Sequence, residues 1–174
     1  MKVWFLPALA LSGFAAAAVA GCTTDGGSGQ PSFYASMADA SATVDAAAAA
    51  SMISGYRGNN GLGAVAIDPE LMRMAMDQAR VMAAKDKLDH SAGRDFNSRL
   101  ATSGFDAKVA VENVGAGYHT LAEAFSGWRD SPSHRANMLK GGVTRLGIAA
   151  VCAPQSKYKV FWALIMAAKE QGRG

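Results

Sequence analysis

The sequence is poor in the residues that hold small secreted domains together and in those that most often carry chemistry. It has two cysteines, Cys22 and Cys152, and three histidines in 174 residues. One cysteine lies near the N-terminus and the other ends an apolar segment, so no disulfide framework is available. The folded part must therefore be held by an apolar core.

Long runs of like charge are also missing. Charged residues make up 18% of the chain, and the formal net charge is only +3. Lys2 would leave with an N-terminal signal, which would reduce the net charge to +2. Such a small, dispersed charge excludes the basic surface typical of nucleic-acid binding.

Two further absences bear on catalysis. There is no nucleophilic serine motif, and the serines beside His90 and His134 in sequence do not by themselves form a catalytic dyad. There is also no His-Glu-x-x-His helix. Spacing alone therefore does not reveal a metal site.

What is present begins with an N-terminal export signal. A positive start, Met1-Lys2, precedes an apolar run that ends at Val19-Ala20-Gly21-Cys22. Small residues before a cysteine are typical of a bacterial lipoprotein signal, so we predict cleavage after residue 21 and lipidation of Cys22. The alternatives are an uncleaved membrane anchor and cleavage by an ordinary signal peptidase. Lipidation would anchor the chain to the membrane on the extracytoplasmic side, at the periplasmic or outer-membrane face.

A flexible linker is predicted for residues 22–43. This segment is dominated by Thr, Asp, Gly, Ser and Ala, and its sizeable apolar residues are Phe33, Tyr34 and Met37. It cannot bury enough surface to fold alone. About twenty flexible residues reach on the order of 25 Å, enough to hold a domain off a membrane.

Residues 44–170 have the length of one domain with its own core. Helices are predicted over 44–56, from Asp68-Pro69 to about residue 87, and over 95–103. Strands are predicted over 109–114, 143–151 and 158–166, the last two joined as an antiparallel hairpin. The last strand is nearly all apolar, as expected for a strand covered on both faces. The fold class is α+β, with a small sheet between helical layers.

The most informative stretch runs from Trp128 to Leu139. An apolar helical face ends near Asp130, because Pro132 cannot continue the helix. Ser131 and Pro132 then favour a second helix, with the serine as N-cap acceptor. His134 would lie in its first turn, where the helix dipole disfavours imidazolium. A neutral ring suits a metal ligand or a general base, although a lone histidine near a helix start more often has a structural hydrogen-bonding role.

Two glutamates stand out for different reasons. Glu112 lies within a Val- and Ala-rich strand, where an unpaired carboxylate would be costly, so it needs a cation, a metal or hydrogen-bond donors nearby. Glu123 follows Thr120 at capping-box spacing, which gives it a structural explanation. The sequence leaves the partner of Glu112 open.

These residues belong to a longer pattern. It consists of His90-Ser91, Val111-Glu112-Asn113-Val114 with Gly117, Glu123 with Trp128, and Ser131-x-x-His134-Arg135-x-Asn137-Met138-Leu139. The pattern resembles the CAP superfamily (cysteine-rich secretory proteins, antigen 5 and pathogenesis-related-1) in its compact bacterial lipoprotein form. The resemblance covers about residues 48 to 168.

The resemblance implies a three-layer α-β-α sandwich with a largely antiparallel central sheet. It also implies a cavity lined by His90, Glu112, Glu123 and His134, which would give Glu123 a role beyond the cap. His119 has no counterpart in the pattern. Two neutral imidazoles can hold zinc or another divalent metal, while carboxylates orient water or balance the charge.

Three functions are compatible with this pattern. The first is a membrane-tethered envelope module that binds a lipid, a glycan or a protein. The second is a metal-dependent hydrolase, in which Glu112 or Glu123 activates a metal-held water. The third is a structural envelope protein whose cavity residues only stabilise the fold. We expect the binding module, with no nucleic-acid partner.

Overall fold

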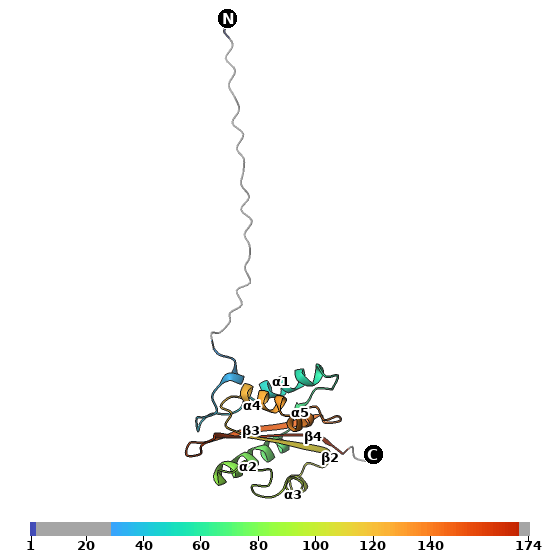
Figure 1. The fold of residues 1–174 in the computed structure, drawn as a ribbon. Helices are drawn as coiled ribbons and strands as arrows, with labels where there is room; N and C mark the ends of the chain where they lie inside the picture. Colours follow the sequence, from blue (N-terminus) through green and yellow to red (C-terminus); the bar gives the residue numbers. More distant parts are fainter. Residues whose placement is uncertain (3–28, 171–174) are drawn as a thin grey trace.

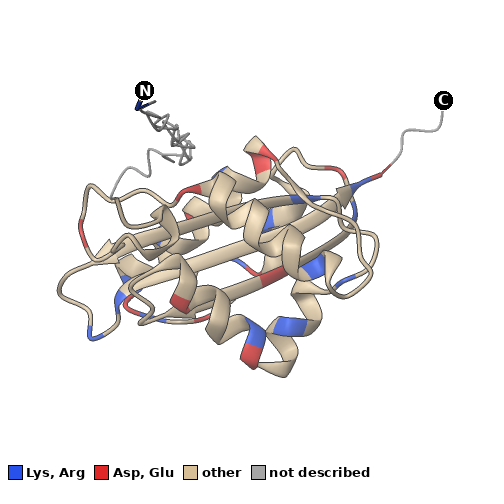
Figure 2. Ribbon diagram, turned by 90° about the horizontal axis from the view of Figure 1, so that it is seen from above, with Lys and Arg blue, Asp and Glu red and all other residues tan. Residues whose placement is uncertain are grey.

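A computed structural model describes residues 1–2 and 29–170 of the chain (Figure 1). Residues 3–21 of the predicted signal segment and Cys22 therefore lie outside the described residues. No helix among residues 29–170 is both long enough and apolar enough to cross a membrane. Basic and acidic residues are scattered over the fold without a field of one sign (Figure 2).

Within residues 29–170, five α-helices form where local signals favour them. Their bounds are α1 Ala46–Gly58, α2 Pro69–Lys85, α3 Phe96–Ala101, α4 Leu121–Asp130 and α5 Pro132–Met138. The N-cap side chains of the first four, Asp45, Asp68, Asp95 and Thr120, each accept a backbone N–H from the first turn. The predicted helix starts at Pro69 and after Asp95 are confirmed.

The sheet has four strands in the order β1-β3-β4-β2. They are β1 Ala66–Ile67, β2 Ala107–Ala116, β3 Arg145–Ala153 and β4 Lys159–Lys169. β4 pairs antiparallel with both β2 and β3, and β1 pairs parallel with β3. The predicted hairpin and the largely antiparallel sheet are confirmed. The two-residue β1 was not predicted, because so short a strand has no periodicity of its own.

Helices cover both faces of the sheet, which makes a three-layer α-β-α sandwich. Figure 1 shows α1, α4 and α5 on one face and α2 and α3 on the other. The side chains of β4 alternate between two buried clusters, one on each face. The layer of α1 and α4 packs against Val160, Trp162, Leu164 and Met166. On the other face, α2 packs against Phe161, Ala163, Ile165 and Ala167. The prediction of a central strand covered on both faces is confirmed.

The predicted helix break in the central stretch is also present. α4 ends at Asp130 and α5 begins at Pro132. Trp128 at the end of α4 is 1% exposed and packs edge-on against Trp162, with ring centroids 6.4 Å apart. One expectation is wrong: Ser131 makes no side-chain cap bond, and its hydroxyl lies 3.4 Å from that of Ser133.

A buried arginine joins the end of α1 to the loop after α5. Arg57 is 1% exposed, and its guanidinium donates to the carbonyl oxygens of Gly63, Met138, Lys140 and Val143 at 2.8 to 3.3 Å. Backbone carbonyls thus replace the water that the guanidinium loses. This arrangement holds the C-terminal end of α5 against the sheet.

Part of the predicted linker packs on the domain. Residues 32–34 form a short 3₁₀ helix, and Met37 is 5% exposed within the core. The Met37 amide donates to the carbonyl of His119 at 2.7 Å. A flexible linker over the whole of 22–43 is therefore wrong for its C-terminal part, because a segment that cannot fold alone still buries Phe33 and Met37 on an existing apolar face.

Candidate functional site

The site is built around Glu112, a buried carboxylate on the edge strand β2. Glu112 pairs with Ile165, so its side chain faces the layer of α2 and α3. Its side chain is only 2% exposed. Arg99 Nη2 donates to both carboxylate oxygens at 2.9 and 2.8 Å, and His90 Nδ1 lies 2.9 Å from Oε1. The partner that the sequence left open is therefore a cation, assisted by an imidazole.

Arg99 is the residue that sequence analysis missed. It lies on α3, its side chain is 11% exposed, and its Nη2 also donates to the His90 carbonyl at 3.1 Å. In the sequence, Arg99 is one of several arginines. It lies on a short helix and belongs to no recognisable motif. The only signal was indirect, namely the need of a buried Glu112 for a counter-charge.

A pair of asparagines holds α5 against the same strand. Asn113 Nδ2 donates to the carbonyl of His134 at 3.0 Å. Asn137 Nδ2 donates to the Asn113 side chain at 2.9 Å and to the Glu112 carbonyl at 3.0 Å. Because consecutive residues of β2 face opposite layers, Glu112 holds His90 from one layer while Asn113 holds the His134 backbone from the other.

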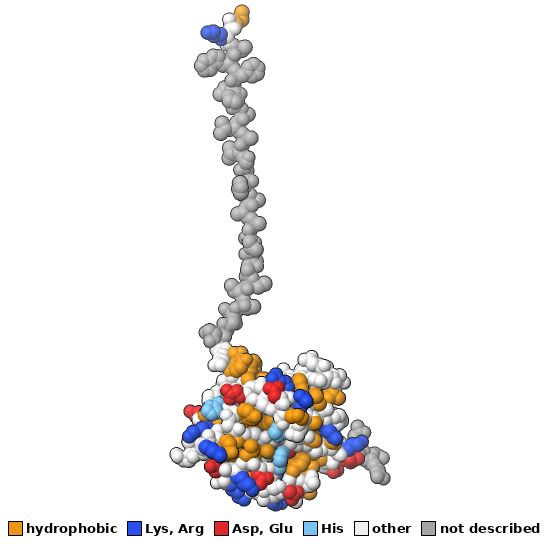
Figure 3. All heavy atoms as spheres, in the orientation of Figure 1, with side chains coloured by type: hydrophobic (Ala, Val, Ile, Leu, Met, Phe, Trp, Pro, Cys, Tyr) orange, Lys and Arg blue, Asp and Glu red, His pale blue; other side chains and the backbone are white. Residues whose placement is uncertain are grey.

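His90 and His134 are consequently tied to the edge strand β2 from opposite layers. The His90 side chain is 51% exposed, and the charge of His90 lowers the pKa of His134. Two histidines surface next to each other on the face seen in Figure 3, while the third lies apart. The two predicted histidines are thus brought within electrostatic reach although they are far apart in sequence.

The pKa values of the two rings shift in opposite directions. The hydrogen bond to Glu112 raises the pKa of His90 above its ordinary value, and the charge of Glu112 adds to this effect. Burial lowers the pKa of His134, with the charge of His90 as a second cause. The predicted lower pKa of His134 agrees with the structure. Its physical cause, however, is burial and a neighbouring charge rather than the helix terminus alone.

Glu123 is not joined to the other predicted site residues. It is exposed, its amide donates to Thr120 Oγ1 at 3.2 Å, and its Oε2 accepts the N–H of His119 at 2.6 Å. This is the predicted capping box with one difference. The glutamate carboxylate accepts the N–H of His119 instead of the N–H of the cap residue Thr120. Within residues 29–170, no group of three or more His, Cys, Asp or Glu side chains is arranged to hold a metal.

We expect the imidazole titrations to reveal this arrangement. In the wild type, His90 should titrate above about 6.5 and His134 below it. In Glu112→Gln the pKa of His90 should fall, because its hydrogen bond to a carboxylate is lost while burial remains. NMR of the imidazole Cε1–H groups against pH measures both rings. A His90 pKa below that of His134 in the wild type would contradict the assigned pair.

The two shifts have opposite consequences for stability. A raised pKa means that the folded state holds the His90 proton more tightly than the unfolded chain. The resulting contribution of His90 to the free energy of unfolding is complete below about pH 6.5. It is lost as the pH rises through the folded pKa of His90. The lowered pKa of His134 destabilises the folded state as the pH falls below about 6.5, because the unfolded chain then takes up the proton first.

Comparison with known proteins places this site in a family. Residues 50–166 match the Cysteine-rich secretory protein family, CAP. The chain belongs to the CAP family. The resemblance noted from the motifs of the sequence is therefore confirmed, and the strands and helices that carry the site all lie within the matched region of the CAP domain. The predicted lipoprotein signal lies outside that region.

Similar proteins come from several bacteria. The CAP domain is 31% identical to the uncharacterized protein YkwD of Bacillus subtilis over 98 residues, which are 55% of this chain and 38% of that protein. It superimposes on an extracellular protein containing an SCP domain from Bacillus anthracis with a TM-score of 0.62 at 22% identity, covering 71% of this chain and 40% of the other. An outer surface protein of Borrelia burgdorferi gives a TM-score of 0.63 at 16% identity, over 74% and 98% of the two chains.

These likenesses confirm the fold of the CAP domain. At such low sequence identities, similarity to the solved structures shows the fold alone. The chain spans well under two thirds of the length of the two Bacillus proteins.

Proposed function

We propose that this CAP domain is a ligand-binding module of the cell envelope, tethered through lipidated Cys22. In this proposal the rings of His90 and His134 hold a divalent ion, such as zinc, at the edge of the sheet. The observation that carries the proposal is the complete pairing of Glu112 by Arg99 and His90. This pairing leaves the His90 imidazole, and not the Glu112 carboxylate, accessible at the edge of the sheet.

The pairing favours binding over hydrolysis. A general base needs a free lone pair within reach of the attacking water. Glu112 is 2% exposed and accepts three hydrogen bonds, and Glu123 accepts a backbone amide at a helix cap. Glu112 therefore has no accessible lone pair for water, and Glu123 makes no hydrogen bond to His90 or His134, so the metal-dependent hydrolase is our second candidate.

The two imidazoles fit a divalent ion in their chemistry. The hydrogen bond from His90 Nδ1 to Glu112 leaves Nε2 free and orients the ring, which is the usual outer-shell arrangement of metal-binding histidines. The lowered pKa of His134 favours its neutral, ligating form. Because zinc commonly takes four ligands, two protein nitrogens leave room for water or for an oxygen of a bound molecule.

An envelope location is supported by the sequence and by the relatives. The N-terminal residues have the pattern of a lipoprotein signal, and the solved relatives include an extracellular protein and an outer surface protein. The ligand classes that fit such a location are lipids, glycans and envelope proteins. Co-sedimentation with lipid vesicles and with cell-wall glycan, with and without zinc, separates the first two classes.

Zinc should stabilise the wild type and fail to stabilise the histidine variants. A ligand that binds only the folded state raises stability by about 2.7 kcal/mol at a hundredfold excess over Kd, which corresponds to several degrees in Tm. We expect this rise in Tm to vanish in His90→Ala and in His134→Ala. It should persist in His119→Ala, and in Glu123→Gln if that residue acts only as a cap. The response is measured as the difference in Tm with and without zinc for each variant.

The comparison within each variant removes the effect of the substitution itself. His90→Ala also removes a hydrogen bond from Glu112, so its Tm without zinc is expected to be lower. A zinc response that survives both His90→Ala and His134→Ala but disappears in His119→Ala would show that the wrong pair of histidines was chosen. A response lost in Glu123→Gln alone would return Glu123 to the metal site.

A further inference from the structure

The exposed side of α1 carries no charge. Residues 46–56 of this helix, and residues 29–38 that precede it, contain no Lys, Arg, Asp or Glu. Ala47 and Ser51, four positions apart on α1, are both exposed. A surface helix normally presents charged and polar side chains to water, whereas this one presents small and mostly apolar ones. The exposed side of α1 is therefore a candidate contact surface.

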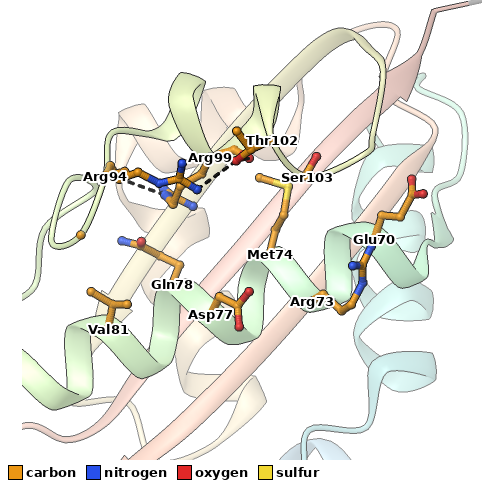
Figure 4. Close-up of a pocket in the computed structure, with 11 residues that line it drawn as sticks. Glu70, Arg73, Met74, Asp77, Gln78, Val81, Arg94, Arg99, Thr102 and Ser103 are labelled. Carbon is orange, nitrogen blue, oxygen red and sulfur yellow. Dashed lines mark hydrogen bonds between the residues drawn. The ribbon is translucent and has the colours of Figure 1, made fainter.

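The opposite helical layer shows the ordinary pattern. Five charged side chains project from α2, namely Glu70, Arg73, Asp77, Arg80 and Lys85. Figure 4 shows the first three beside a polar cavity of about 310 Å³, which lies between α2 and α3 and is also lined by Arg99. The two helical layers thus differ in charge, and the layer of α2 is suited to water.

An apolar groove runs beside the exposed side of α1, against the segment that leads into the domain. Its volume is about 540 Å³, and it is lined by Pro31, Ser32, Phe33, Ala48, Ser51 and Met52. The short 3₁₀ helix η1 Ser32–Tyr34 forms one wall, and Tyr34 is 49% exposed. Figure 3 shows apolar side chains gathered where the described chain reaches the domain. This wall therefore offers an aromatic side chain to the surroundings.

The segment that carries η1 is fixed to the domain. Ser32 Oγ donates to Asp45 Oδ2, in the N-cap residue of α1, at 2.6 Å. Phe33 packs against the core cluster on this face of the sheet, and Met37 is 5% exposed within it. The Met37 amide donates to the carbonyl of His119. The chain therefore enters the domain at a defined place, beside the groove.

The predicted lipid anchor is close to this place in sequence. Cys22 precedes residue 29 by seven positions. Covalent geometry limits seven residues to a span of at most about 25 Å, compared with about 70 Å for a tether that ran from residue 22 to residue 43. A contact made by a tethered domain is intramolecular, so a weak apolar contact is enough to orient it.

We propose that η1 and the exposed side of α1 form the surface with which the domain rests on the bilayer. This inference depends on the lipid anchor of the proposed function, and adds the orientation of the domain. Tyr34 enters the interfacial region, which favours an aromatic ring with a polar end. Residues 29–56 contain two carboxylates, Asp39 and Asp45, and no Lys or Arg. The partner is therefore a zwitterionic bilayer surface rather than an anionic one.

The test places a fluorescent label on either face of the lipidated chain in phosphatidylcholine vesicles. Cys152→Ser removes the free thiol, and lipidation occupies the thiol of Cys22. Ser51→Cys on α1 or Asp77→Cys on α2 then provides one labelling position, exposed in both cases. With a nitroxide quencher on the lipid headgroups, we expect most of the fluorescence to be lost at residue 51 and none at residue 77. Co-sedimentation of the same samples measures the anchoring itself.

A matched pair of substitutions tests whether the contact needs an uncharged surface. Ala47→Asp introduces a charge on the exposed side of α1, in the first turn, where the helix dipole favours an acid. The quenching at residue 51 should be lost, because a charge is costly at the membrane, while Cys22 keeps the protein in the pellet. Ala84→Asp makes the same change at an exposed position of α2 and should leave the quenching unchanged.

Four results would overturn the proposal. Equal quenching at residues 51 and 77 in sedimented protein would show that the domain turns freely on an intact anchor. Quenching at residue 51 that survives Ala47→Asp would remove the role of the uncharged surface. No quenching at residue 51, together with a dimer in sedimentation velocity, would assign the surface to a second copy of the chain. Protein that stays in the supernatant lacks the anchor, which removes both the tether of the proposed function and this orientation.

Discussion

Arg99→Met should destabilise the domain by about 3–5 kcal/mol, because it leaves a buried carboxylate without its cation. The Glu112 side chain is 2% exposed and receives two of its three hydrogen bonds from Arg99 Nη2. The remaining partner, His90, has a side chain that is 51% exposed and cannot replace a buried guanidinium. The free energy of unfolding from urea denaturation measures the loss.

Two controls identify the cause. In the double variant Arg99→Met with Glu112→Gln, most of the loss should be recovered, because no buried charge remains. Arg94→Met removes an exposed arginine of the preceding loop, whose hydrogen bond to Thr102 is 2.9 Å long, and should cost less than about 1 kcal/mol. A loss below about 1 kcal/mol in Arg99→Met would show that Glu112 does not depend on this ion pair.

Gly147→Ala should be similarly damaging, by at least about 3 kcal/mol, for a reason of packing. Gly147 lies on β3 where the first turn of α2 crosses the sheet. A Cβ at this position would collide with the backbone atoms of Leu71 and Met72. Backbone cannot rotate away as a side chain can, so α2 would have to move off the sheet. Leu71 and Ala75, both 0% exposed, would then lose part of their packing. Urea denaturation again gives the loss in the free energy of unfolding.

Gly141→Ala is the matched control. No atom lies within 4 Å of a Cβ built at Gly141, and its φ is compatible with alanine. We expect a change within about 0.5 kcal/mol, with a slight gain from the reduced freedom of the unfolded chain. If Gly147→Ala were as harmless as Gly141→Ala, the close approach of α2 to β3 would not be a requirement of the fold.

The location of the helices and strands followed from local features of the sequence. Asp68 before Pro69, Asp95 before a short helix, and Pro132 after Trp128 specify helix ends through the backbone of a few residues. The apolar strand that became β4 indicated burial on both faces, which the two core clusters confirm. Such signals involve neighbours in sequence, so they can be recognised without knowing the fold.

The site was only partly predictable for the opposite reason. Position 112 was recognised as a carboxylate in need of a partner, but Arg99 lies on a separate helix and carries no mark of that role. Glu123 matched a family motif and a capping box at once, and only the path of α4 shows the cap in use. The packing of Met37 on the core likewise depends on a surface built by distant residues.

The sequence by itself therefore determined the five helices and the three longer strands, the α+β class, the family resemblance and the candidate histidines, because composition, periodicity and caps act over a few residues. Tertiary structure alone decided that Glu112 is neutralised by Arg99, that His90 and His134 lie within electrostatic reach of each other, and that a polar cavity lies beside Arg99. These depend on strand order and on which face each side chain occupies. Burial then makes pairing of the buried charges necessary, because no water reaches them.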